Sequence, residues 1–249
     1  MTSRCTEGDL FGWVQEGVGL EGCQSEYVRV PIADSTLLKV PEGLSDESAL
    51  LLGDNFSTGY FCAEMAEVKP GGTYLVIGCG TVGLLAILSA IDMGAKQVFA
   101  MDPVGERRVI AESLGAIPLE SNEGGRESVL SATAGRGADA VMELVGLPEA
   151  QKMAFDCLRP GGIMSVIGCH CTPNFSFSPV DAYDKNITYR SGRCPAGHYM
   201  RFLVDRVVRG DFDLPRFISH QFSIDEAERA YQVFSTRAEG CLKAVFNFG

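Results

Sequence analysis

Short apolar runs alternate with helical stretches from Thr73 to Arg190, and this alternation restricts the fold more than any other feature of the sequence. Parallel strands need a crossover connection, usually a helix, so the pattern predicts βαβ units. It therefore indicates an α/β fold with a doubly wound, six-stranded parallel sheet covered on both faces. The expected strands are Thr73–Ile77, Gln97–Met101, a short one at Ile117, Ala140–Leu144, Ile163–Ile167 and Ile187–Arg190.

Three segments between these strands have the character of crossover helices. Thr81–Met93 is apolar nearly all round, as a helix pressed against a sheet would be, and Glu106–Leu114 is amphipathic and ends at Gly115. Pro148–Leu158 runs into Arg159-Pro160-Gly161-Gly162, which predicts a helix stop and a tight turn before the next strand.

The two ends of the chain do not continue the alternation. Met1–Gly53 is rich in glycine and turn residues, with one strand-like run at Glu26–Val30 and no helical period. Near the other end, Ser223 followed by Glu226 predicts a capping box. We expect both ends to pack as parts of a second domain. The helix after the box should carry one apolar face, and a final strand should follow it: Ala227, Ala230, Tyr231 and Phe234, then Leu242–Phe246.

Charge and composition narrow the partners. The 21 basic and 32 acidic side chains give a formal charge of −11, which repels nucleic acid and anionic membranes. No apolar run approaches the roughly 20 residues that span a bilayer, and the first residues lack the apolar centre of a signal peptide. Nine cysteines, several of them in apolar contexts, indicate reduced, buried thiols and a cytoplasmic protein.

A glycine-rich turn lies directly after the first strand of the alternation. Gly78, Gly80 and Gly83 form a GxGxxG between Thr73–Ile77 and the next helix. The first glycine permits a tight turn, the second lets a diphosphate approach the backbone, and the third lets the helix pack closely on the strand. The helix N-terminus then favours the phosphates. The expected diphosphate-binding residues are Gly78, Cys79, Gly80, Thr81, Val82 and Gly83.

An acidic residue ends the second strand at the distance expected for a ribose ligand. Asp102 lies about 20 residues beyond the last glycine of the turn, where a carboxylate accepts hydrogen bonds from the adenosine ribose and repels a 2′-phosphate. This favours NAD over NADP, with Arg107 against the same ribose. The alternative is a solvated Asp102 that caps the next helix. Arg108 has a weaker case and is equally compatible with a surface charge.

Together these motifs resemble the zinc-type medium-chain dehydrogenases and reductases of the alcohol dehydrogenase superfamily. The residues that carry the resemblance are Gly53-Asp54-Asn55-Phe56-Ser57-Thr58-Gly59-Tyr60, Gly78–Gly83, Asp102 and Arg159-Pro160-Gly161-Gly162. Within the superfamily the chain looks most similar to alcohol, threonine and glutathione-independent formaldehyde dehydrogenases. The resemblance implies a Rossmann NAD-binding domain at 56–192 and a partial GroES-like catalytic domain made of 1–55 and 193–249.

The resemblance also assigns positions around the nicotinamide. It implies that Thr58 touches the nicotinamide, that residues at the ends of two strands line the pocket, and that Lys243 binds the diphosphate. A surface lysine is the alternative for Lys243. The implied lining residues are Val145 and Gly146 after the fourth strand, Ile167, Gly168 and Cys169 after the fifth, and Gly192 to Cys194 at the carboxamide.

Zinc ligands are implied at two positions. Asp54 matches the third ligand of the catalytic zinc, or else it caps the helix that begins near Ser57. Cys5 resembles the last of four structural-zinc cysteines, or is an ordinary free thiol. The other ligands and the catalytic residues are expected upstream of Met1, so we expect an N-terminally truncated chain that binds the nucleotide, does not retain zinc and is slow or inactive. Cys169-His170-Cys171 is a poor metal site, because neighbours on a strand point to opposite faces.

The predicted activity of the complete enzyme is NAD-linked hydride transfer between an alcohol and an aldehyde or ketone. The alternatives are a non-catalytic NAD(H)-binding or regulatory subunit, a zinc-free reductase of the same superfamily and, more remotely, a nucleotide methyltransferase. The substrate is a small molecule that the sequence does not identify, and Tyr60, His198 and Tyr199 are candidates for its pocket or are packed or surface residues. A homodimer or homotetramer is compatible with Phe175 and Phe177 beside a sheet edge.

Overall fold

The structure is a computed structural model that describes residues 9–248, and it divides into two compact units. One unit combines Met1–Gly53 with Pro195–Gly249, and the other is the continuous segment Asp54–Cys194. We refer to them as the split unit and the central unit. The assignment of the split unit to a GroES-like domain stays a prediction.

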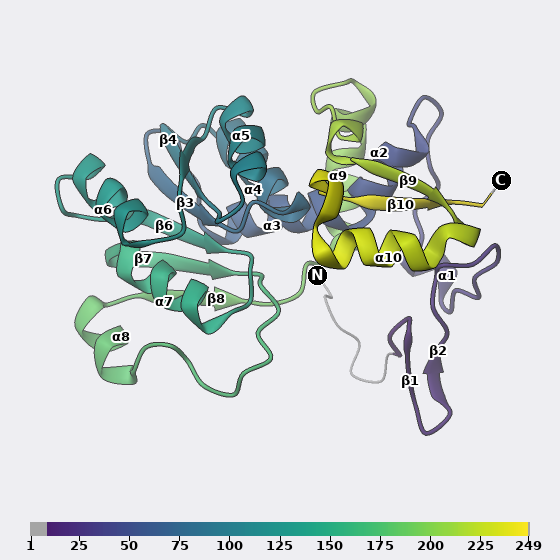
Figure 1. Ribbon diagram of the computed structural model, residues 1–249, viewed down its shortest axis with the longest axis horizontal. Coiled ribbons are helices and arrows are strands. Elements are labelled where there is room, and N and C mark those ends of the chain that lie inside the picture. The colour runs from purple at the N-terminus through teal and green to yellow at the C-terminus, as the bar shows by residue number, and fades with distance from the viewer. Residues whose placement is uncertain (1–8, 249) are drawn as a thin grey trace. The chain divides into compact units, whose positions relative to one another are not determined.

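The central unit is built on the six-stranded sheet that the sequence predicts, and every pairing in the sheet is parallel (Figure 1). The strand order is β5-β4-β3-β6-β7-β8, so the chain moves outward from β3 on one side and then returns to β6 on the other. The point where the order reverses lies between β3 and β6, which is where ligands bind in doubly wound folds. The strands are β3 Thr73–Ile77, β4 Gln97–Met101, β5 Ile117–Leu119, β6 Ala138–Glu143, β7 Leu158–Val166 and β8 Thr188–Ser191.

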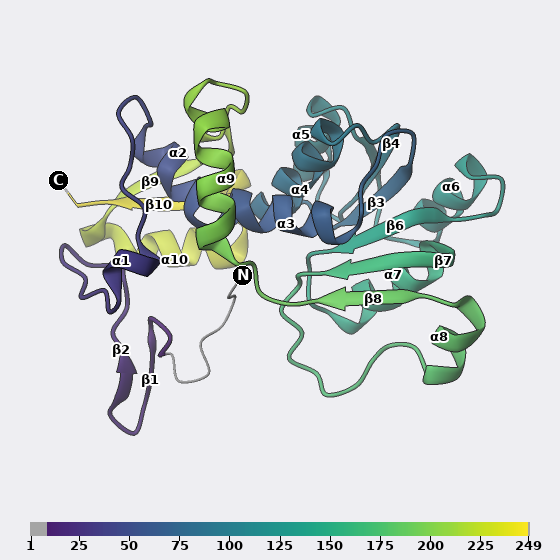
Figure 2. The ribbon, with the colours of Figure 1, turned by 180° about the vertical axis from the view of Figure 1, so that it is seen from behind.

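Helices cover both faces of this sheet, as Figures 1 and 2 show from opposite sides. The sequence did not predict α6, whose apolar content is low and which contains two glycines. It forms because Asn122 caps its first turn by accepting a hydrogen bond from Gly125 N at 3.0 Å and because Val129 is fully buried. The helices are α3 Ser57–Met65, α4 Thr81–Asp92, α5 Gly105–Ser113, α6 Glu123–Ala132, α7 Pro148–Cys157 and α8 Pro179–Lys185.

The segment Arg159-Pro160-Gly161-Gly162 does not form the predicted turn before the strand, because it is part of β7 itself. The register explains this: Ala138 lies opposite Leu158, but Ala140 lies opposite Ile163, so β7 carries extra residues against β6. Gly161 has φ +67 within this bulge. The predicted end of the helix before this segment is confirmed, whereas the predicted tight turn is a bulge within β7.

A half-buried carboxylate, Asp139, ties the start of β3 to β6 and β7. Asp139 Oδ2 accepts a hydrogen bond from Thr73 N at 2.9 Å, and Oδ1 accepts from Arg136 Nη1 at 2.6 Å and from Arg159 Nε at 2.9 Å. Burial alone would raise the pKa of Asp139, but these donors together lower it from 3.8 to about 2.

The N-terminal part of the split unit differs from the sequence prediction. Glu26–Val30 forms no strand and is largely exposed. A hairpin lies earlier in the chain instead, with a turn at Glu16 (φ +52) and Gly17 (φ +79) whose positive φ values suit a two-residue hairpin. Two short helices also occur where no helical period is present. These elements are β1 Trp13–Gln15, β2 Val18–Leu20, α1 Ala33–Thr36 and α2 Asp46–Leu51.

The C-terminal part of the split unit contains the predicted capping box, in which Ser223 and Glu226 bond each other's backbone N–H groups. The apolar face expected on the following helix is wrong in part. Ala230 and Val233 are buried, whereas Tyr231 is 58% and Phe234 52% exposed. The final strand pairs in parallel with an unpredicted one. The elements are α9 Ala196–Val208, η2 Pro215–Phe217, β9 His220–Ser223, η3 Ile224–Glu226, α10 Ala227–Thr236, η4 Ala238–Gly240 and β10 Ala244–Asn247.

The longest helix between residues 9 and 248 is α9, with 13 residues. A bilayer requires roughly 20 apolar residues in a helix. Within the described chain, therefore, no helix combines the length and apolarity that a membrane crossing needs.

Candidate dinucleotide site

The turn between β3 and α4 has the geometry that the glycine motif predicts. Gly78 has φ +94, a conformation that strains any residue with a Cβ. A Cβ on Gly83 would lie 1.8 Å from the Gly78 carbonyl oxygen, so the helix can approach the strand this closely only without a side chain. Gly80 is the N-cap of α4, and a Cβ there would meet nothing within 4 Å. The turn thus leaves open space in front of a helix N-terminus, where a diphosphate would fit.

Asp102 holds this turn in place. Its Oδ2 accepts a hydrogen bond from Cys79 N at 2.7 Å, and its Oδ1 accepts one from Val104 N at 2.8 Å. The side chain is buried, with 3% of the residue exposed, so a solvated strand-end carboxylate is excluded. Because each carboxylate oxygen has a second lone pair, the group can still accept hydrogen bonds from ribose hydroxyls.

The two arginines after Asp102 have different roles. Arg108 Nη1 donates to the carbonyl oxygens of Asp102 at 2.8 Å and Pro103 at 3.0 Å, and Nη2 lies 3.5 Å from Glu120 Oε1. Arg108 is therefore a structural residue and not merely a surface charge. Arg107 is half-buried and has no hydrogen bond or ion pair to another described residue, so its guanidinium stays available to a ligand.

A pocket of about 200 Å³ lies at the carboxyl ends of β3, β4 and β6. Its walls are mostly apolar, which suits the planar ring of a nucleobase. Sequence reasoning missed most of its lining, because these residues come from four separate loops that only the sheet order brings together. The lining residues are Ile77, Gly78, Met101, Pro103, Ser121, Val145, Leu147, Glu149, Ala150 and Met153.

The residues predicted to line the nicotinamide pocket lie at the ends of the neighbouring strands β6 and β7. Gly146 has φ +83, and a Cβ there would lie 2.7 Å from both N and O of Cys169. A Cβ on Gly168 would lie 2.3 Å from Gly146 N. The structure thus brings Gly146 against Gly168 and Cys169, backbone to backbone, whereas the Val145 side chain lies beside Gly78.

Glu143, which the sequence analysis did not single out, is the fully buried carboxylate behind these loops. It accepts hydrogen bonds from Val145 N at 2.7 Å, Gly146 N at 2.8 Å and His170 Nε2 at 2.9 Å. A signal was present in the sequence, because an acidic residue within an apolar strand is almost never fully buried without partners.

A third group of predicted residues lies at the start of α3. Asp54 belongs to the π-helical turn Leu52–Phe56, and its carboxylate accepts hydrogen bonds from Thr58 Oγ1 and Asn55 Nδ2, each at 3.2 Å. The N-cap interpretation of Asp54 is wrong, since the N-cap of α3 is Phe56 and α3 has no side-chain cap. Single π-turns occur preferentially at functional sites. Burial raises the pKa of Cys194 to about 12, although a hydrogen bond with Thr58 opposes this.

The remaining predicted positions are more dispersed. Gly192 is exposed, and a Cβ there would meet nothing within 4 Å. Tyr60 and Tyr199 are buried, and His198 packs edge-to-face on Tyr199 with ring centroids 5.1 Å apart. Nothing in these contacts identifies a substrate pocket.

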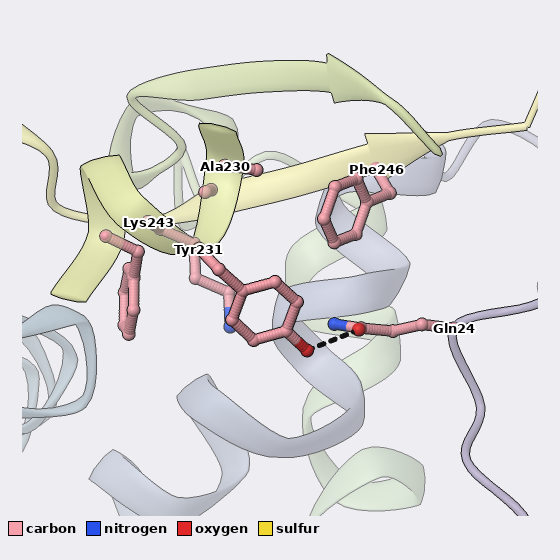
Figure 3. Close-up of a pocket in the computed structure, with 7 residues that line it drawn as sticks. Gln24, Ala230, Tyr231, Lys243 and Phe246 are labelled. Atoms are coloured by element: carbon pink, nitrogen blue, oxygen red, sulfur yellow. Dashed lines mark hydrogen bonds between the residues drawn. The ribbon is translucent and has the colours of Figure 1, made fainter. Parts of the chain in front are cut away.

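Lys243 lines a pocket of about 180 Å³ in the split unit (Figure 3). The walls are largely aromatic, and the Tyr231 hydroxyl is 2.6 Å from Gln24 Oε1. The exposed face of α10, which the sequence predicted to be buried, supplies part of this wall. The lining residues are Gln24, Ala230, Tyr231, Phe234, Lys243, Ala244 and Phe246.

The donor set for a metal is incomplete in the part of the chain that the structure describes. No group of three or more His, Cys, Asp or Glu side chains among residues 9–248 is placed to hold a metal ion. Asp54 therefore has no partner ligands there, and these residues do not fit a catalytic zinc, which needs three protein ligands. Cys5 lies outside the described residues. Cys169 and Cys171 are exposed, contrary to the expectation of buried thiols, and His170 bonds Glu143.

Comparison with known proteins gives consistent matches. A family profile described as zinc-binding dehydrogenase matches residues 81–208. The chain is 37% identical to a zinc-type alcohol dehydrogenase B of Aspergillus flavus, covering 100% of this chain and 58% of that protein. It is 37% identical to a probable zinc-binding alcohol dehydrogenase of Mycobacterium tuberculosis, covering 88% of this chain and 56% of that protein. The chain thus spans a little over half the length of these relatives.

A solved structure shares the fold. The alcohol dehydrogenase of Thermus sp. ATN1 superimposes with a TM-score of 0.89 at 34% sequence identity. The match covers 96% of this chain and 70% of that protein.

Proposed function

The chain belongs to the zinc-binding dehydrogenases, and from this membership we propose that its central unit binds NAD and that the reaction which this cofactor serves is hydride transfer between an alcohol and an aldehyde or ketone. The Asp102–Cys79 hydrogen bond carries the proposal. It fixes a carboxylate against the glycine turn, at the point of the sheet where the strand order reverses. The residues that would hold the diphosphate and ribose are Gly78 to Gly83, Asp102 and Arg107.

The geometry of Asp102 supports NAD over NADP. Both carboxylate oxygens are engaged by backbone N–H groups, so the group cannot rotate away from an incoming ligand. A 2′-phosphate would then meet a fixed, poorly solvated negative charge, whereas a 2′-hydroxyl would donate a hydrogen bond to it.

Fluorescence titration with NADH and NADPH tests this proposal. We expect NADH to bind at least about tenfold more tightly than NADPH. Asp102→Asn should weaken NADH about tenfold and narrow the preference for NADH over NADPH, because it removes the charge and replaces one of the two acceptor oxygens with an NH2 donor. Glu106→Gln, which changes an exposed carboxylate in the first turn of α5, is the matched control and should leave the preference intact. Equal affinities for both nucleotides in the unchanged chain would refute the assignment.

The activity needs a separate test, because the described residues do not complete a zinc site. We propose that this chain binds the dinucleotide but converts alcohol and aldehyde slowly or not at all, because the described residues do not supply the three protein ligands of a catalytic zinc. Steady-state assays with alcohols, NAD and added zinc, together with metal analysis, measure this directly. Turnover of about 1 s⁻¹ or faster would contradict it. Nucleotide binding without zinc or turnover would favour a non-catalytic NAD(H)-binding or regulatory subunit.

We also propose self-association through β8, the last strand of the sheet. Beside it, Phe175 is 59% exposed and lies edge-to-face on Tyr189 with ring centroids 5.1 Å apart, while Phe177 stacks on Phe155. An open strand with an exposed aromatic neighbour suits an isologous dimer, alone or within a tetramer. Sedimentation of the wild type and of Phe175→Ser tests it, and a wild type that is monomeric at micromolar concentration would exclude it.

A further inference from the structure

The carboxylate of Glu143 divides its two oxygens between two loops. Oε1 accepts the hydrogen bonds from Val145 N and Gly146 N, which follow β6, and Oε2 accepts the one from His170 Nε2, which follows β7. The residue therefore joins the two loops through one side chain. Its backbone carbonyl adds a second link, since it accepts hydrogen bonds from Ile167 N at 2.9 Å and Gly168 N at 3.0 Å.

The two loops have little freedom to move against each other while these bonds exist. A Cβ on Gly168 would lie 2.6 Å from Glu143 Oε2 as well as 2.3 Å from Gly146 N, so the three residues are in close contact. The His170 N–H also bonds the Gly168 carbonyl at 3.0 Å, which brings the imidazole back toward the carboxylate.

Burial makes the imidazole bond important. Glu143 is fully buried, whereas the side chain of its partner His170 is 16% exposed. A buried carboxylate oxygen that loses its donor is costly, so water must enter or the loop must shift. Either change would move the walls formed by Gly146 and Cys169. The bond also requires a proton on Nε2, which leaves Nδ1 as the acceptor in a neutral ring.

We infer that Glu143 and His170 are positioning residues for the nicotinamide half of the cofactor site. The inference rests on the proposed NAD binding, under which Val145, Gly146 and the 167–169 segment line the nicotinamide. The pair holds these two walls at a fixed separation, so that the ring enters a preformed slot. Neither residue needs to touch the ring to have this effect. The adenosine half depends instead on the turn at Gly78–Gly83 and on Asp102.

The test compares NADH with ADP-ribose, which has the same adenosine and diphosphate but no nicotinamide. His170→Phe keeps a planar ring and removes the Nε2 donor. We expect this variant to raise the Kd of NADH about tenfold, the effect of one lost hydrogen bond to a charged group, while the Kd of ADP-ribose changes less than about twofold. His170→Gln can donate from Nε2 to the same carboxylate oxygen, so it should recover most of the NADH affinity.

The outcomes separate this inference from the proposed function. Equal weakening of NADH and ADP-ribose in His170→Phe, or no weakening of either, would overturn the positioning role. Failure of the unchanged chain to bind either ligand would instead refute NAD binding itself and the inference with it.

Hydrogen exchange on the unchanged chain gives a check that no folding defect can obscure. NADH should slow exchange in the peptide that spans 166–171 beyond the effect of ADP-ribose. Identical exchange with the two ligands would count against the inference.

Discussion

Replacing Asp139 by Asn should cost the central unit stability in a pH-dependent way. The side chain accepts three hydrogen bonds, two of them from arginines, and these lower its pKa from 3.8 to about 2. Each unit of difference between the folded and unfolded pKa is worth about 1.4 kcal/mol, so the ionised carboxylate contributes about 2 kcal/mol to the free energy of unfolding. The Asp139 side chain is 26% exposed, so screening by solvent removes only part of this stabilisation.

The sign of the pH dependence follows from the lowered pKa. The stabilisation is fully present above about pH 5, where an unfolded Asp is ionised, and is lost as the pH falls through 4 toward 2 and below. Wild type and Asp139→Asn should therefore differ by about 2 kcal/mol at pH 7 and by about half as much at pH 3.

Amide exchange in the peptide that contains β6 is the suitable assay, because the single tryptophan, Trp13, lies in the split unit and does not report on the sheet. Asp156→Asn is the matched control. It removes a similarly exposed acidic residue whose one ion-pair partner, Lys152, lies one helical turn away with a 54% exposed side chain, and it should cost less than about 0.5 kcal/mol. A difference between wild type and Asp139→Asn that stays constant from pH 7 to pH 3 would show that the charge is not responsible.

Three further results are expected. Gly83→Ala should lower the free energy of unfolding by about 2 kcal/mol or more and abolish NADH binding, because its Cβ would overlap the Gly78 carbonyl. Gly80→Ala has open space around its Cβ, so it should keep the wild-type stability and lose only affinity for NADH. Equal losses of stability in the two variants would contradict this. Ser223→Ala should cost about 1 kcal/mol through loss of its capping box, as chemical denaturation can measure. Ser235→Ala, at an exposed position in α10, the helix that follows the box, should be nearly neutral. Burial raises the pKa of Cys62, Cys79 and Cys157 to about 12, so mass spectrometry after brief alkylation at pH 8 should find them unmodified, and rapid labelling of any of them would contradict their burial. Among the cysteines that the structure describes, those expected to react first are Cys23, Cys169 and Cys171.

The sequence allowed a sound prediction of the parts that depend on local pattern. The strands Thr73–Ile77 and Gln97–Met101 have the predicted bounds, since continuous apolar runs flanked by turns leave little freedom. Residue identity also fixed the glycine turn, because only glycine tolerates the positive φ at Gly78 and the contact at Gly83.

What the sequence did not predict depends on partners distant in the chain. In the sequence, Glu143 is an acidic residue within an apolar strand, and its partner His170 lies 27 residues later. Asp54 was a plausible N-cap because its place in a π-helical turn has no local signature. The exposure of Tyr231 and Phe234 on α10 was also not predictable from the local pattern. An amphipathic pattern identifies an apolar face, but it does not tell how much of that face the two-stranded sheet of β9 and β10 covers.

The division of the chain has a consequence for biosynthesis. Tyr231, in the last part of the chain, bonds Gln24, near the beginning, and the whole central unit separates the two in sequence. At about 5–20 residues per second, Gln24 emerges from the ribosome roughly 10 to 40 s before its partner Tyr231 is translated. During that interval the central unit can complete its sheet, whereas the early segment waits with apolar side chains uncovered that are buried in the folded chain, such as Leu20 and Leu51, a natural point for chaperone binding.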